Sequence, residues 1–125
     1  MTVPRDEDWL SFASGVDVPQ ALANMRGKAP LLQEVARTFI EDAPVQLNKL
    51  KEGLASGDAD LTANSAHAMK SSLELLAAPR AHALAYQVEL AGKTGDMERA
   101  ARLNAELSAE LNKVFEDLAA IVADS

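Results

Sequence analysis

The sequence predicts an all-α protein, an antiparallel four-helix bundle with one or two short N-terminal capping helices. Apolar residues recur every three or four positions over long stretches, which is the spacing of one helix face. Hydrophobic residues make up 48% of the 125 residues, but the aromatic ones are only three Phe, one Trp and one Tyr, and there is no cysteine. Leu, Ala, Val and Met must therefore fill the core, which favours helix packing over a sheet. Glycine and proline are sparse and divide the chain into segments joined by short loops.

Residues 1–28 are expected to form short lid or opening helices. The first, about Glu7 to Ala13, is too short to be stable without packing on other helices. The second follows Asp17, which is a candidate N-cap, and has Pro19 in its first turn. Gly27 is expected to end it. The apolar side chains of these two opening helices are Trp9, Leu10, Phe12, Ala21, Leu22 and Met25.

A long helix is expected to begin at Pro30 and end at Gly57. Pro44 lies in its middle and should kink the helix rather than end it, because the apolar stripe continues in phase on both sides. Asp58 is then placed to cap the next helix. The stripe of the long helix consists of Leu32, Val35, Ala36, Phe39, Ala43, Leu47, Leu50 and Leu54.

Three more amphipathic helices complete the expected bundle, which occupies residues 29–123 of a single domain, 1–125. The first of them runs from Asp58 to about Ala78, the second starts at Pro79, and the turn Gly92–Asp96 separates the second from the third. Their inward residues are Leu61, Ser65, Met69, Leu73 and Leu76, then Leu84, Val88 and Ala91, and finally Leu103, Leu107, Leu111, Val114, Leu118 and Ile121.

Composition and missing motifs exclude several classes of protein. The absence of cysteine excludes disulfide scaffolds, zinc ribbons and iron–sulfur sites. A net charge of −7 without a basic run argues against binding to nucleic acid or an anionic membrane. No apolar stretch is long enough to span a bilayer and the N-terminus is unlike a signal peptide, so we predict a cytoplasmic protein. No nucleotide-binding, metalloprotease or serine-hydrolase motif is found.

The two histidines are then the only side chains that titrate near neutral pH in the unperturbed state. His67 falls in the middle of a polar stripe opposite the apolar face of its helix, and the small Ala63 and Ser71 lie one turn away. Lys70 is placed to bring an ammonium group beside any anion attached to the ring. His82, in the first turn of its helix, lacks these neighbours and is interpreted as a surface or packing residue. The polar stripe consists of Asp60, Asn64, His67, Lys70, Ser71 and Glu74.

The segment Ala66–Ser71, which reads AHAMKS, resembles the A-H-x-L-K-G signature of histidine-containing phosphotransfer (HPt) domains. The resemblance extends over nearly the whole chain. Phe39–Pro44 resembles the F-x-x-D-A-P segment of the family, and Leu54–Asp58 resembles its A-L-x-x-G-D turn. Leu84–Asp96 is similar to the L-x-x-x-L-E…G-D segment, and Asp17–Lys28 to the short opening helix.

This resemblance implies that His67 carries a phosphoryl group and that the protein is a phosphoryl carrier and not a kinase. The phosphoryl group would come from the phospho-aspartate of a receiver domain and leave to another receiver domain, and the partner would supply Mg²⁺, so the chain needs no cofactor of its own. Lys70 would stabilise the phosphoryl charge, and Asn64 and Ser71 are weaker candidates as hydrogen-bond donors. Ala63, Ala66 and Glu74 are candidate docking residues. In the opening helices, Trp9, Phe12, Leu22 and Met25 either dock the partner or close the core.

Three residues depart from the family pattern. Ser71 and Ala77 stand where glycines are usual, and Met69 replaces the usual leucine, which is a volume-conserving change. Ser71 either donates a hydrogen bond to a phosphoryl oxygen or obstructs docking.

Two other functions fit the sequence. One is a non-catalytic bundle that docks receiver or kinase domains without carrying phosphate. The other is a structural domain that self-associates through the stripe from Leu103 to Leu118, whereas the phosphotransfer function predicts a monomer.

Overall fold

The computed structural model describes residues 15–123, and in that range the chain forms five helices and no strand. The expected helix at about Glu7 to Ala13, with Trp9 and Phe12, lies outside the described residues. The helices are α2 (Val18–Asn24), α3 (Ala29–Ser56), α4 (Ala59–Leu75), α5 (Pro79–Thr94) and α6 (Met97–Ala123).

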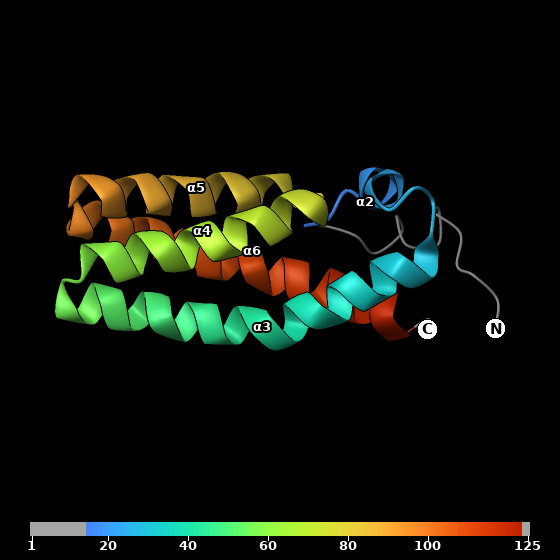
Figure 1. The fold of residues 1–125 in the computed structure, drawn as a ribbon, viewed down its shortest axis with the longest axis horizontal. Coiled ribbons are helices and arrows are strands. Elements are labelled where there is room, and N and C mark those ends of the chain that lie inside the picture. Colours follow the sequence, from blue (N-terminus) through green and yellow to red (C-terminus); the bar gives the residue numbers. More distant parts are fainter. Residues whose placement is uncertain (1–14, 124–125) are drawn as a thin grey trace.

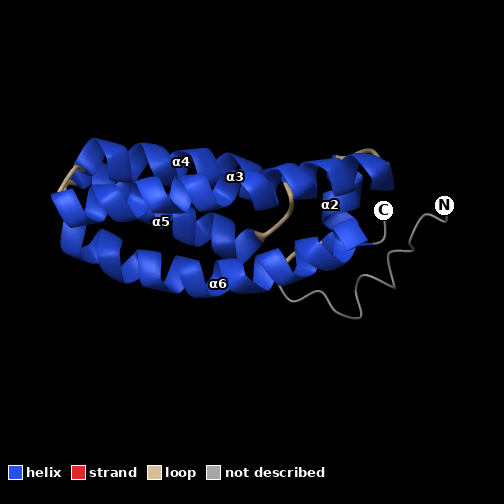
Figure 2. Cartoon of the chain, turned by 90° about the horizontal axis from the view of Figure 1, so that it is seen from below, coloured by secondary structure: helices blue, strands red, loops and turns tan. Residues whose placement is uncertain are grey.

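The four long helices form an antiparallel bundle, as the sequence predicts. α4 packs against α3 and α5, and α6 packs against the same two helices, while the chain runs back and forth along the bundle (Figure 1). The short α2 lies at one end of the bundle, beside the start of α3 (Figures 1 and 2). Within residues 15–123, no helix is both long and apolar enough to cross a membrane.

Capping residues set the helix ends. The side chains of Asp17 and Asp58 accept hydrogen bonds from backbone N–H groups in the first turns of α2 and α4. Gly57 ends α3 with φ of 72°, a left-handed conformation that glycine adopts without steric cost. α4 ends earlier than expected, at Leu75, because the chain turns at Ala77 with a positive φ of 56°.

Pro44 lies inside α3, and the helix continues through it as expected. The ribbon of α3 changes direction part-way along its length (Figure 1). Proline removes one backbone hydrogen bond and crowds the preceding turn, which bends a helix at that point.

Most of the core consists of side chains on the apolar stripes predicted from the sequence, but Val35, Leu47, Leu54 and Leu61 are only partly buried. On α6, the six residues of the expected stripe, from Leu103 to Ile121, are all buried within the bundle. That stripe is therefore used for folding, and it is not a free surface for self-association. Leu22 on α2 and Met25, which directly follows α2, are buried as well. These two residues therefore close the core and do not form a docking surface.

Candidate functional site

His67 lies in the middle of α4 on its solvent-facing side, and 58% of its side chain is exposed. Asn64 and Ser71, one turn before and after it, are also exposed, and Glu74 follows on the same side of the helix. The imidazole is therefore reachable by another macromolecule while its backbone is held in a rigid helix.

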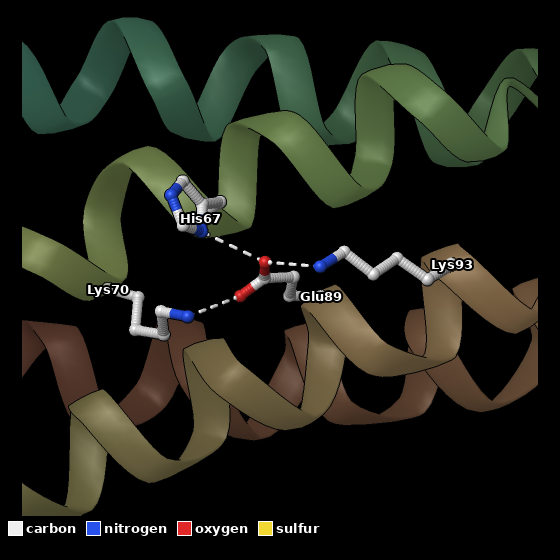
Figure 3. Close-up of polar contacts among 4 residues, drawn as sticks. All are labelled: His67, Lys70, Glu89 and Lys93. Atoms are coloured by element: carbon white, nitrogen blue, oxygen red, sulfur yellow. Dashed lines mark hydrogen bonds and ion pairs between the residues drawn. The ribbon is translucent and has the colours of Figure 1, made fainter.

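One nitrogen of this imidazole is bound within the protein. His67 Nδ1 lies 2.9 Å from Oε2 of Glu89 on α5 (Figure 3). A carboxylate only accepts hydrogen bonds, so Nδ1 carries the proton and donates it to Glu89. In the neutral ring, Nε2 is then the nitrogen with the free lone pair, and it faces away from Glu89.

The carboxylate of Glu89 also holds two lysines. Lys70 Nζ lies 2.8 Å from Oε1, and Lys93 Nζ lies 3.1 Å from Oε2, the oxygen that also binds His67. The two ammonium groups approach the carboxylate from opposite sides (Figure 3). Lys70 Nζ also lies 4.8 Å from the centre of the Tyr86 ring, a distance at which a cation is attracted to the aromatic face.

Glu89 is ionised in this arrangement although only 3% of its side chain is exposed. Burial by itself raises the pKa of Glu89, but the hydrogen bonds from Lys70, Lys93 and His67 outweigh it and lower the pKa from 4.5 to about 2. The imidazole therefore has a permanent negative charge on its Nδ1 side at any pH near neutrality.

Small residues bring α4 and α5 close enough for these contacts. A Cβ atom on Gly92 would lie only 3.0 Å from the backbone nitrogen of Ala63, so the two helices approach each other there with no room for a side chain. Gly92 lies three residues after Glu89, inside α5, whereas the sequence suggested that it belonged to the turn after this helix. It is thus a packing residue next to the site.

The structure corrects two of the predicted docking residues. Ala63 and Ala66 are buried where α4 packs on the rest of the bundle, so neither can touch a partner directly. Their small size allows close helix packing below His67. His82 lies elsewhere, partly buried in a pocket beside α2 that Asp17 and Asn24 also line.

Sequence reasoning assigned no role to Glu89, Lys93 and Tyr86. A signal for Glu89 was present, because it lies on the inward face of α5, four residues after Ala85 and three before Gly92. A carboxylate in an otherwise small and apolar stripe indicates a buried ion pair. No such signal marks Lys93 or Tyr86, since exposed residues of these types are common on helix surfaces.

The comparison with protein families agrees with this geometry. The family model of the Hpt domain matches residues 34–120, well over half of the chain and including all four residues of the site. The chain belongs to the Hpt-domain family. Its functional class is therefore histidine phosphotransfer in phosphorelays, and its partners are phosphorelay proteins such as receiver domains.

A solved structure supports the fold of this Hpt domain. The crystal structure of histidine-containing phosphotransfer protein B (HptB) from Pseudomonas aeruginosa PAO1 aligns with a TM-score of 0.82 and 19% sequence identity. The alignment covers 90% of this chain and 98% of HptB. No curated protein matches the sequence.

Proposed function

We propose that this Hpt domain accepts a phosphoryl group on Nε2 of His67 from the phospho-aspartate of a receiver domain and passes it to a second receiver domain. The observation that carries this proposal is the hydrogen bond from Nδ1 to the buried, ionised Glu89. It fixes the tautomer and leaves a lone pair on the nitrogen that faces away from Glu89.

The transfer needs little from this chain except position and charge. The Nε2 lone pair attacks phosphorus in line, the Nε2–P bond forms as the P–O bond to the donor aspartate breaks, and the aspartate leaves as a carboxylate. The proton stays on Nδ1, where Glu89 balances the positive charge that develops on the ring. The receiver supplies its own Mg²⁺ and aspartate, and no nucleotide takes part.

The partner surface that we propose combines the exposed face of α4 with the groove between α3 and α4. Asn64, Ser71 and Glu74 lie on that face of α4. The groove beside it is lined by Phe39, Asp42, Ala43, Gln46, Ala68, Met69 and Ser72. An apolar floor with a polar rim suits a small, transient interface with a receiver domain. We further propose that the domain acts as a monomer in the cytoplasm.

The test is to mix the protein with a phosphorylated receiver domain and analyse the phosphate transferred to it. We expect phosphate that is labile in acid and stable in base, which is the behaviour of a phosphohistidine. Binding of the receiver without any such phosphate would instead identify a non-catalytic docking bundle.

Lys70 is proposed to neutralise the phosphoryl group, since it lies one turn after His67 on the same helix. We expect Lys70→Ala to slow transfer on the order of tenfold, because a hydrogen bond to a charged group is worth about 1.5–3 kcal/mol. Stopped-flow or gel-based transfer kinetics with a phosphorylated receiver measure this. An unchanged rate, with unchanged helicity by circular dichroism, would remove Lys70 from the mechanism.

A further inference from the structure

Three donors share the single carboxylate of Glu89. Two of them are lysines and one is the Nδ1–H of His67, so with a neutral imidazole the four side chains carry one positive charge in excess. Since the whole chain has a net charge of −7, this is a local reversal of sign. The excess charge lies beside the His67 imidazole, on its Nδ1 side.

Lys70 and Lys93 differ in how they are held. Lys70 is 20% exposed and lies on α4, between the Tyr86 ring and Oε1 of Glu89. Lys93 is 60% exposed and lies on α5, one turn after Glu89. Lys93 reaches Glu89 from the side opposite Lys70 (Figure 3).

Glu89 cannot lose its cations freely, because a buried carboxylate without a partner is strongly destabilising. If Lys70 turns toward a phosphoryl group on His67, Oε1 of Glu89 loses its ammonium partner. Of the two lysines, Lys70 lies on the helix of His67, one turn after it, so it is the one placed to turn toward a phosphoryl group on that ring. The carboxylate then depends on the contacts at Oε2, from Lys93 and His67.

We propose that Lys93 is a positioning residue that holds the charge of Glu89 so that Lys70 is free to move from Glu89 to the phosphoryl group. This inference rests on the proposed function of His67. Lys93 acts through Glu89 and does not touch the phosphoryl group. The phosphorylated state thus keeps Glu89 paired with Lys93 and with the Nδ1 proton, while Lys70 changes its partner.

The experiment uses phosphoramidate, a small phosphoryl donor that needs no protein partner. Its P–N bond breaks and ammonia leaves as the Nε2–P bond forms, and the half-life of the product is followed by ³¹P NMR. The variants are Lys93→Gln, Glu89→Gln, the double variant, and Lys93→Arg. Arg102→Gln is the matched control, because Arg102 also forms an exposed i,i+4 pair, with Glu98 on α6.

We expect Lys93→Gln to shorten the half-life of the phosphohistidine on the order of fivefold, because Lys70 is then retained by Glu89. Lys93→Arg keeps a cation beside Glu89 and should have the half-life of the wild type, and Arg102→Gln should also leave the half-life unchanged. In the Glu89→Gln background, Lys93→Gln should have no further effect, since a neutral amide does not need a cation.

Two results would overturn this inference and leave the proposed function of His67 intact. One is an unchanged half-life in Lys93→Gln, and the other is an equal loss with and without Glu89, which would mean that Lys93 binds the phosphoryl group itself. A wild-type protein that forms phosphohistidine neither with phosphoramidate nor with a phosphorylated receiver would overturn the proposed function, and the inference with it.

Discussion

A chain carrying His67→Gln should fold normally but accept no phosphoryl group from a phosphorylated receiver domain. Glutamine has no nucleophilic nitrogen, so transfer should fall below detection and not merely slow down. The fold should survive, because the His67 side chain is mostly exposed and does not belong to the core. Radiolabelled phosphate transfer, with circular dichroism on the same samples, measures both expectations.

The matched control for this variant is His82→Gln. His82 is the other histidine of the chain, and it lies on α5 in the pocket beside α2. The control variant should accept phosphate at the wild-type rate. Full acceptance by His67→Gln, or loss of acceptance in His82→Gln alone, would mean that the site is wrongly assigned.

The second large effect is on stability. Glu89→Gln should lower the free energy of unfolding at pH 7 by about 3 kcal/mol, because the pKa of Glu89 is lowered from 4.5 to about 2 in the folded protein. A lowered folded-state pKa adds stability that is fully present above the unfolded value and is lost as the carboxylate is protonated. The difference between wild type and variant should therefore shrink as the pH falls from about 4.5 to about 2.

Urea denaturation at a series of pH values measures this difference. Glu106→Gln, which removes an exposed glutamate on α6, serves as the control and should change the stability little at any pH. A Glu89→Gln variant as stable as wild type at pH 7, or a difference that grows toward acid pH, would contradict the assigned ion pairs.

The fold follows from local patterns in the sequence, so most of it was predictable. The regular aliphatic stripe of α6 defines one buried face, and Asp17, Asp58 and Gly57 mark helix ends through their capping chemistry. The sequence-based predictions that the structure corrects concern residues whose role depends on a neighbouring helix. Gly92 suggests a turn in the sequence, but in the fold it allows a close approach to Ala63.

The site was predictable only in the part that lies on one helix. The segment around His67 places the histidine and Lys70 on a common exposed side of α4. Glu89 is 22 residues away from His67 and lies on another helix, so its contact depends on the register between α4 and α5. Helical periodicity determines which face of each helix is buried, but it does not determine that register.

NMR spectroscopy of the His67 imidazole in ¹⁵N-labelled protein, before and after phosphorylation, shows which ring nitrogen carries the proton and which carries the phosphoryl group. The structure predicts a proton on Nδ1, bound to Glu89, and a bare Nε2 in the free protein. After phosphorylation, ³¹P coupling should appear at Nε2 while Nδ1 keeps its proton. A proton on Nε2 in the free protein, or a phosphoryl group on Nδ1, would mean that Glu89 does not direct phosphorylation to Nε2 of His67.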